Sequence, residues 1–408
     1  MDKRPELLAP AGDRERFDSA FMAGADAIYV GSTMFSMRSA PKNFDFDSLK
    51  EICTLSHKKG VKIYLTMNTL PKNSEIPKLQ SYIENAAAAG VDAFIVADIG
   101  VLKYCKTYAP EVDVHISTQA GIVNYLTANE FYDMGAKRIV TARELSLSEI
   151  AEIRAKTPKQ LEIECFVHGA MCVSFSGRCL LSNYLVGRDA NRGECAQPCR
   201  WEYYLMQKDR QGNFFPIDNN SNGTYILNSK DMCMIEHIPD LVKAGIDSFK
   251  IEGRAKSAYY TAVITNAYRA AIDAYLKNPT DSFVPEQWIV DEVRKVSYRE
   301  YCTGFYYEAP RIDANISYEG GYRREWDVMA VVEKCENGYI FVEQRNKFSV
   351  GEELEALEFG VKPISFTVEE ILDAEGNSVE SAPHATMKAR IKSDLDFKPG
   401  TLLRRQSQ

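Results

Sequence analysis

Short apolar stretches alternate with helical stretches through the first two-thirds of the chain. The apolar stretches are continuous runs, which is typical of parallel strands buried on both faces. Several helical stretches end at a glycine, such as Gly24, Gly60 or Gly90, where a left-handed C-cap stops a helix before the next strand. The eight expected strands are Leu7–Pro10, Ala27–Val30, Lys62–Thr66, Ala93–Ala97, Val114–Ser117, Arg138–Thr141, Glu162–Val167 and Ser248–Ile251. Eight strand–helix units predict an α/β fold of the (β/α)8, TIM-like barrel type.

A doubly wound open sheet is the competing architecture for such a chain. The segment after the first expected strand lacks Gly-x-Gly-x-x-Gly, the glycine pattern that dinucleotide-binding sheets carry at that place. The barrel is therefore the leading expectation for the first two-thirds of the chain.

The pattern changes towards the C-terminus, where alternating apolar and polar positions replace the helical stretches. Expected strands there include Val328–Val332, Tyr339–Val342 and Phe366–Leu372, separated by turns rich in Gly and Asn. This pattern predicts a small all-β barrel domain. The three expected parts are a TIM-like barrel over residues 1–280 with a cysteine-rich insertion at 168–230, a connector over 281–324, and the small β-barrel domain over 325–408.

The function of the C-terminal domain is open at this stage. It is expected either to pack against the barrel or support oligomerisation, or else to help dock a macromolecular substrate. The basic residues available for docking are Lys347, Arg404 and Arg405.

Composition and charge narrow the class of protein. The formal net charge of −8 argues against binding nucleic acid over the whole surface, because phosphate contacts are made mostly by Lys and Arg, but it leaves room for a local basic patch. No apolar run approaches the roughly 20 residues that cross a bilayer, and the start of the chain does not resemble a signal peptide. We therefore expect a cytoplasmic protein with no membrane segment.

Ten cysteines in such a chain favour metal binding or catalysis over a disulfide framework. Four thiolates at loop spacings suit either zinc or an iron–sulfur cluster. Neither close pair has the C-x2-C spacing of zinc knuckles, and the segment follows an expected barrel strand, so we favour iron–sulfur. The expected ligands are Cys172, Cys179, Cys195 and Cys199.

Polar residues follow the expected strands, and in a TIM barrel the C-terminal ends of the strands form the active-site face. Arg143, Arg178 and Arg254 are suited to clamp carboxylates of an anionic small molecule through bidentate hydrogen bonds. The further candidates for substrate binding are Gln119, Asp98 and Asn68, and the candidates for catalysis are His168, Glu252 and Arg254.

Three segments together carry a resemblance to a known family. They are the opening Glu6–Gly12, the cysteine segment beginning at Glu164, and Lys250-Ile251-Glu252-Gly253-Arg254. The chain resembles the collagenase-like peptidase family U32 from about residue 5 to 405. Its length, the stretch at 193–203 and the C-terminal domain are most similar to the branch that forms 5-hydroxyuridine in tRNA.

The resemblance implies an oxygen-independent hydroxylase that acts on the wobble uridine of tRNA. It implies prephenate as co-substrate and a four-iron, four-sulfur (4Fe-4S) cluster at Cys172, Cys179 and Cys195, with Cys199 or Cys233 as fourth ligand. The alternative function is a peptidase, for which His168 and Cys172 could form a thiol–imidazole pair. A third reading is an iron–sulfur scaffold protein without catalysis.

Overall fold

The computed structural model describes residues 4–37, 42–172, 179, 181–190, 193–201, 205–206, 214–215, 229–307 and 322–407. Eight parallel strands form a closed barrel, because the last of them, β11, pairs with both β1 and β7. The strands are β1 (Glu6–Ala11), β2 (Ala27–Gly31), β3 (Lys62–Met67), β4 (Ala93–Val96), β5 (Asp113–Ile116), β6 (Arg138–Val140), β7 (Glu162–Ala170) and β11 (Ser248–Ile251). All eight expected strands and the TIM-like barrel are confirmed.

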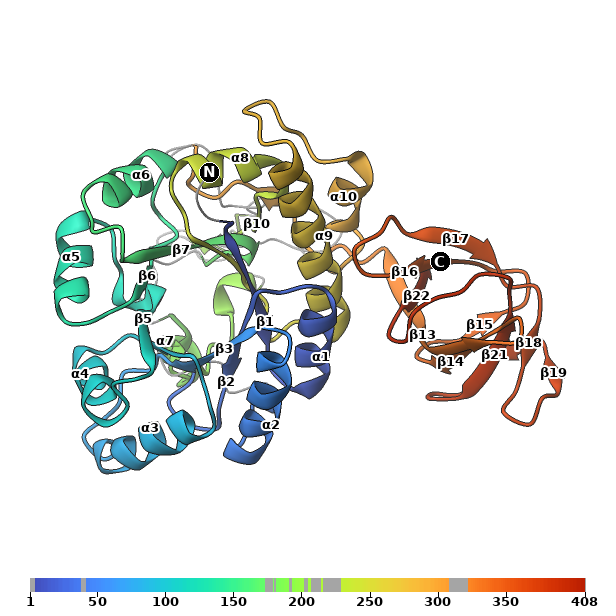
Figure 1. Cartoon of the computed structure of the whole chain (residues 1–408), viewed down its shortest axis with the longest axis horizontal. Coiled ribbons are helices and arrows are strands. Elements are labelled where there is room, and N and C mark those ends of the chain that lie inside the picture. The colour runs from blue at the N-terminus through green and yellow to red at the C-terminus, as the bar shows by residue number, and fades with distance from the viewer. Residues whose placement is uncertain are drawn as a thin grey trace.

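Helices surround this barrel, as Figure 1 shows. Helices between consecutive barrel strands are α1 (Arg14–Met22), α2 (Phe46–His57), α3 (Leu79–Ala88), α4 (Ile99–Tyr108), α5 (Tyr125–Asp133), α6 (Leu147–Ala155), α7 (Leu181–Val186) and α8 (Ile238–Lys243). After β11 come α9 (Ala258–Lys277) and α10 (Gln287–Glu292), and short 3-10 turns lie at Ile76–Lys78 (η1), Thr118–Ala120 (η2), Pro198–Arg200 (η4) and Ile235–His237 (η5).

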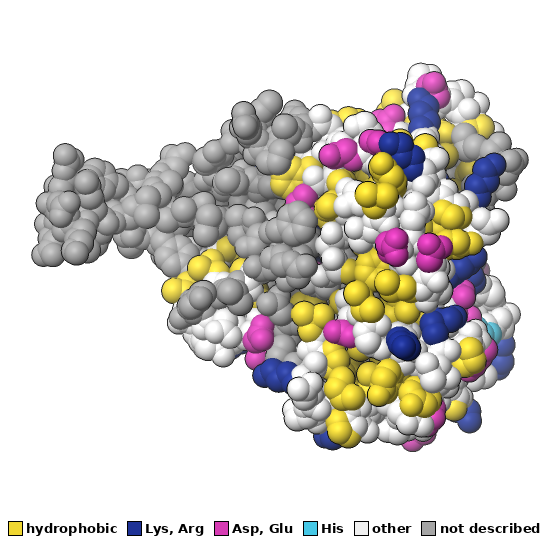
Figure 2. Space-filling model, turned by 90° about the vertical axis from the view of Figure 1, so that its left-hand side faces the viewer, with side chains coloured by type: hydrophobic (Ala, Val, Ile, Leu, Met, Phe, Trp, Pro, Cys, Tyr) yellow, Lys and Arg dark blue, Asp and Glu magenta, His cyan; other side chains and the backbone are white. Residues whose placement is uncertain are grey.

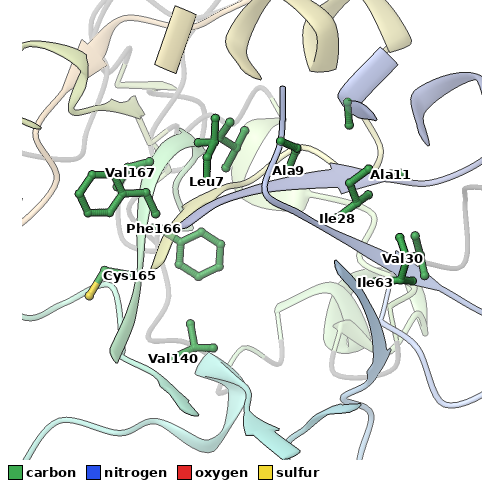
Figure 3. Close-up of a cluster of buried hydrophobic side chains, with 14 of the residues drawn as sticks. Leu7, Ala9, Ala11, Ile28, Val30, Ile63, Val140, Cys165, Phe166 and Val167 are labelled. Atoms are coloured by element: carbon green, nitrogen blue, oxygen red, sulfur yellow. The ribbon is translucent and has the colours of Figure 1, made fainter. Parts of the chain in front are cut away.

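The main core lies between the strands and the helices. Leu7, Ile28 and Val140 belong to one continuous cluster of buried side chains. Figure 3 shows Cys165 and Phe166, neighbours on β7, pointing to opposite sides of the strand. This alternation gives one side of each strand to the helices and the other to the barrel interior.

The barrel sheet continues beyond the closed barrel in a way that the sequence did not predict. Strand β10 (Asp231–Cys233) pairs antiparallel with β7, and β12 (Tyr301–Cys302) pairs parallel with β10. The segment after α10, which we expected to be an irregular connector, therefore contributes a strand to this sheet. Within the insertion, the structure also describes a short ladder between β8 (Leu205–Met206) and β9 (Phe214–Phe215).

The C-terminal domain lies beside α9 and α10 (Figure 1) and is built on an eight-stranded antiparallel sheet. Its strands in sheet order are β17 (Ile364–Thr367), β16 (Glu353–Leu357), β22 (Leu402–Gln406), β13 (Trp326–Glu336), β14 (Tyr339–Gln344), β21 (Lys388–Lys392), β18 (Ile371–Leu372) and β19 (Ser378–Val379). A separate pair joins β15 (Phe348–Ser349) to β20 (Ser381–Ala382). The expected all-β domain is confirmed.

One expected strand of this domain, Phe366–Leu372, is wrong. The chain leaves the pairing of β17 with β16 after Thr367 and joins a different neighbour, β21, at Ile371. The buried Val368 anchors the crossing through backbone hydrogen bonds to the segment before β16. The side chains that pack in the core of this domain step by two from Phe366 to Val368 and by three from Val368 to Ile371, so the alternation is interrupted where the chain changes neighbours.

The two domains are joined by a buried ion-pair cluster. Arg404 on β22 donates hydrogen bonds to Glu292 on α10 and to Glu355 on β16, and its side chain is fully buried. Lys295 lies 3.0 Å from Glu292 and 2.8 Å from Glu355. Arg405 forms an ion pair with Glu352. Arg404 is therefore inaccessible to a docking partner, which contradicts its expected role in substrate docking.

Candidate functional site

A polar pocket opens at the C-terminal ends of the barrel strands. Its volume is about 60 Å³. Side chains from β2, β3, β4, β7, β11 and the segments that follow the strands line it, and we call it the mouth pocket. The lining residues are Tyr29, Met37, Thr66, Asn68, Ile95, Ser117, Thr118, Gln119, Arg143, Phe166, Lys250, Glu252 and Arg254.

Three cationic side chains and one carboxylate are among these described lining residues. Arg143 donates a 3.2 Å hydrogen bond to Glu252, and its guanidinium lies 4.0 Å from the centre of the Phe166 ring. The ammonium of Lys250 lies 2.6 Å from the carboxylate of Glu164. Ion pairing and stacking hold these long side chains in place, so little rotational freedom remains to be lost when a ligand binds.

Arg254 is fixed by hydroxyl groups at the rim of the barrel. Its guanidinium donates to the Ser36 hydroxyl at 2.7 Å and to the Thr66 hydroxyl at 2.5 Å, and the side chain is only 2% exposed. Gly31 makes this approach possible, because a Cβ atom there would lie 2.6 Å from the guanidinium and 2.7 Å from the Ser36 hydroxyl. Hydrogen bonds and close packing therefore hold the guanidinium in a fixed position at the pocket.

Amide and hydroxyl groups also line the mouth pocket. Asn68 accepts a hydrogen bond from the backbone N–H of Met37 and lies 3.4 Å from the hydroxyl of Ser117. Ser117 also accepts from the backbone N–H of Gln119, at the start of η2. Thr118 donates to the carbonyl of Thr141. These groups are donors and acceptors of fixed position, suited to orient a polar ligand.

Beneath the mouth pocket the barrel interior holds a buried ion network. Arg138 contacts Glu6 at 2.6 Å, Glu162 at 2.6 Å and Glu164 at 3.0 Å. Burial alone would raise the pKa of Glu6, but the charge of Arg138 and hydrogen bonds from Arg138, Tyr64 and Ser248 outweigh it and lower the pKa. Glu164 links this network to Lys250. The floor of the mouth pocket therefore rests on charged groups that pair with one another.

The structure brings five of the expected site residues to the mouth pocket and places two others, Asp98 and His168, elsewhere. Asn68, Gln119, Arg143, Glu252 and Arg254 line the pocket. Asp98 instead caps α4, where it accepts a hydrogen bond from the backbone N–H of Val101. Arg178 lies outside the described residues. Roles in binding and catalysis stay predictions for all of these residues.

His168 faces away from the mouth pocket because of an irregularity in β7. The pairing of β7 with β11 passes from Phe166–Lys250 to His168–Ile251, so Val167 is one extra residue on β7. Such a bulge reverses the alternation of side chains beyond it. The His168 ring lies 5.5 Å from the Tyr268 ring on α9, between the barrel and the helix, and is 1% exposed. Burial chiefly lowers its pKa to about 3.

Several pocket residues were not foreseen from the sequence. Lys250, Phe166, Tyr29 and Thr66 lie on strands that we had treated as core. The alternation of Glu164, Phe166 and Lys250, Glu252 with apolar neighbours is a signal that could have identified the inward-facing side of these strands. Ser36 could not have been found in this way, because it lies in a loop.

The cysteines fall into two groups by environment. Cys53, Cys105 and Cys165 are buried in the core, and burial chiefly raises the pKa of each thiol to about 12. The four expected cluster ligands are outside the core, with Cys172 exposed and Cys179, Cys195 and Cys199 half-buried. Cys233 is half-buried as well, so none of the five expected ligands belongs to the fully buried group.

Cys233 differs from the other expected ligands. It lies on β10 opposite His168, near Tyr268, whose hydroxyl donates to the carbonyl of Val167. Burial chiefly raises the pKa of this thiol to about 12. Within the described part of the chain, no three His, Cys, Asp or Glu side chains come together to hold a metal ion. A bound metal itself deprotonates a thiol ligand, so this pKa does not choose between Cys199 and Cys233, and the ligand set stays a prediction.

None of the described helices is long and apolar enough to cross a membrane. Figure 2 shows acidic, basic and hydrophobic side chains interspersed on the side of the barrel opposite the C-terminal domain. Among the described residues in this view, the basic side chains do not form an extended patch.

Comparison with known proteins places the chain in a family. The barrel and its polar mouth define a TIM-like barrel protein with a pocket at the C-terminal ends of the strands. The family model "Peptidase family U32" matches residues 12–315, and "Peptidase family U32 C-terminal domain" matches residues 324–404. The chain therefore belongs to peptidase family U32, which confirms the resemblance seen in the sequence.

Relatives in this family carry different names. The chain is 36% identical to "tRNA hydroxylation protein P1" of Bacillus subtilis over 407 residues, covering 99% of this chain and 96% of that protein. It is 34% identical to "tRNA hydroxylation protein P" of Escherichia coli over 446 residues, covering 98% and 97%. It is also 35% identical to "Collagenase" of Porphyromonas gingivalis over 311 residues, covering 74% and 73%.

Proposed function

We propose that this protein is an RNA-modifying enzyme that hydroxylates a nucleoside of tRNA at the barrel mouth. The observation that carries the proposal is the similarity to tRNA hydroxylation proteins over both domains, 99% of the chain in one relative. A base must leave its stack to reach a pocket of this kind, as in other enzymes that modify nucleobases. The target proposed here is the wobble uridine, which would become 5-hydroxyuridine.

The mouth pocket supports an anionic co-substrate, for which we propose prephenate. Prephenate carries two carboxylates, and arginine binds carboxylates through two parallel hydrogen bonds. Arg143 and Arg254 both line the pocket. Phe166 and Glu252 hold Arg143, and hydroxyl groups hold Arg254. Binding to preordered arginines loses little side-chain entropy, and the amide of Asn68 would orient the ligand's polar groups.

We further propose that Cys172, Cys179, Cys195 and Cys199 hold a 4Fe-4S cluster. These thiols follow β7, at the end of the barrel that carries the mouth pocket. When bound, such a cluster supplies electron transfer or Lewis-acid activation. The residues of the mouth pocket bind and orient the ligand and exclude water from it.

A peptidase is the second candidate, favoured by the name of the Porphyromonas gingivalis relative. A thiol peptidase needs an imidazole within hydrogen-bond reach of its cysteine. The His168 imidazole instead forms a hydrogen bond with the hydroxyl of Tyr301, at 3.4 Å. This geometry offers the peptidase less support than the mouth pocket offers the hydroxylase.

The test is to measure 5-hydroxyuridine by mass spectrometry in tRNA from cells lacking this protein. The strain is complemented with the wild type, Cys179→Ser, Arg254→Lys, or the control Arg324→Lys, which alters an exposed arginine far from the pocket. A hydrogen bond to a charged group contributes about 1.5–3 kcal/mol, so Arg254→Lys should lower the rate of hydroxylation about 10- to 100-fold. The control should match the wild type.

Loss of 5-hydroxyuridine in the deletion strain, restored by wild type and not by Cys179→Ser, supports the cluster-dependent hydroxylase. Unchanged 5-hydroxyuridine in every strain refutes the proposed function. Peptide hydrolysis by the purified protein would then be measured next, with His168→Ala and Cys172→Ala as the informative variants.

A further inference from the structure

A second, larger pocket adjoins the mouth pocket. Its volume is about 360 Å³, within the range of sites for small organic ligands, whereas the 60 Å³ of the mouth pocket accepts only part of such a molecule. The segment after β2 and the segment from Thr69 to η1 form its walls. We call it the side pocket.

The two pockets share a wall at Ser36. This residue lines the side pocket, and its hydroxyl contacts Thr66 at 2.5 Å and Arg254 at 2.7 Å, both of which line the mouth pocket. The next residue, Met37, lines the mouth pocket and donates its backbone N–H to Asn68. A ligand with its reacting part in the mouth pocket would therefore place its neighbouring group at the side pocket.

The charges of the side pocket favour an oxyanion. Lys42 and Lys78 both line it, and neither ammonium has an ion-pair partner among the described residues. One carboxylate, that of Glu75, is among the described lining residues, and it accepts a hydrogen bond from the backbone N–H of Lys72. The hydroxyls of Thr33 and Thr69 and the amide of Asn43 add neutral polar groups. The two cations outnumber the one carboxylate, so the charge of these residues attracts phosphate.

We propose that the side pocket binds a backbone phosphate of the RNA strand, next to the nucleoside that enters the mouth pocket. This inference rests on the proposed function, because it names the part of the same substrate that the side pocket recognises. In an acidic protein with net charge −8, a local pair of unpaired lysines supplies the attraction that the whole surface does not. The phosphate fixes the position of the strand and so brings the base to the opening of the mouth pocket, beside the co-substrate.

The experiment measures binding of an unmodified tRNA transcript to the full-length protein over a range of KCl concentrations. The variants are Lys42→Gln, Lys78→Gln and the double variant. Lys58→Gln is the matched control, since Lys58 is an exposed lysine at the C-terminal end of α2, just before β3 and so at the opposite end of the barrel. Each single-strand phosphate contact contributes about 0.7 to the salt slope, which corresponds to about fourfold in affinity at 0.15 M salt.

We expect the double variant to bind tRNA about 15-fold more weakly at 0.15 M KCl and to lower the salt slope by about 1.4, with Lys58→Gln unchanged. Inorganic phosphate should compete with tRNA for the wild type more strongly than for the double variant. Unfolding temperatures equal to that of the wild type would show that the variants are folded.

An unchanged salt slope in the folded double variant overturns the inference. A raised KM for prephenate with an unchanged slope would also overturn it, because the side pocket would then serve a carboxylate of the co-substrate. If the protein hydroxylates tRNA but the double variant keeps the salt slope of the wild type, the phosphate site is refuted and the proposed function stands. A lowered slope in a protein that does not hydroxylate tRNA leaves the phosphate site standing and removes the proposed function.

Discussion

The ion-pair cluster between the domains gives a prediction whose magnitude can be worked from the structure. The cluster contains two carboxylates, Glu292 and Glu355, and two cations, Lys295 and Arg404. The side chains of Arg404 and Glu292 are 0% and 1% exposed. The charges balance, so replacing Arg404 by methionine leaves one buried negative charge without compensation.

Removing one partner of a buried ion pair costs about 3–5 kcal/mol, because the remaining charge stays away from water. Lys295 remains 3.0 Å from Glu292 and reduces this cost, so we expect Arg404→Met to destabilise the folded protein by about 3 kcal/mol. In the double variant Arg404→Met/Glu292→Leu, the remaining pair of Lys295 and Glu355 is again balanced. The double variant should therefore recover most of the lost stability.

The assay is urea unfolding followed by tryptophan fluorescence. Trp326 is a local reporter, since the Arg404 guanidinium lies 5.4 Å and the Lys295 ammonium 4.7 Å from its ring. Arg405→Met is the matched control, because Arg405 pairs with Glu352 nearer the surface and exposed pairs contribute about 0–1 kcal/mol. Equal destabilisation by Arg404→Met and Arg405→Met would refute the reasoning, and so would a double variant less stable than Arg404→Met alone.

Two further predictions concern the barrel and the cysteines. Burial, with the charges of Arg138 and Lys250, holds the pKa of His115 well below its ordinary value, so stability should be full above about pH 6.5 and fall by up to about 1.4 kcal/mol per unit as the pH is lowered. His115→Phe should flatten this dependence in urea unfolding between pH 7.5 and 5, and an equally steep curve would contradict the assignment. In anaerobically purified protein, iron content should fall to background in Cys179→Ser, and retention of iron in that variant would contradict the cluster site. Cys199→Ser and Cys233→Ser identify the fourth ligand, because only the variant that lacks this ligand should lose iron.

Much of the mouth pocket could be predicted from local sequence pattern. Each barrel strand is a short apolar run, and the residues just after the strands converge because parallel strands end on the same face. Asn68, Gln119, Arg143, Glu252 and Arg254 were found in this way, and all five line the pocket. Asp98 follows the same rule in sequence, but its carboxylate is used to cap α4. The sequence also carried enough of the family's motifs to identify the family.

Other features depended on contacts between residues far apart in the chain. One extra residue in the pairing of β7 with β11 turns His168 towards α9. The register between two strands cannot be predicted from the sequence of either strand alone. From the sequence, Arg404 is expected to be an exposed cation, but the packing of β22 against α10 buries it beside Glu292. Ser36 joins two pockets because Arg254, 218 residues away, reaches it across the barrel rim.

The sequence by itself therefore determined the strands of the barrel, the all-β class of the C-terminal domain, and the group of polar strand ends, because these follow from local periodicity. The tertiary structure decided which side chains face the mouth pocket, which charges are buried, and where the two pockets meet. Those properties depend on register and on the packing of distant segments, which no local pattern of residues specifies.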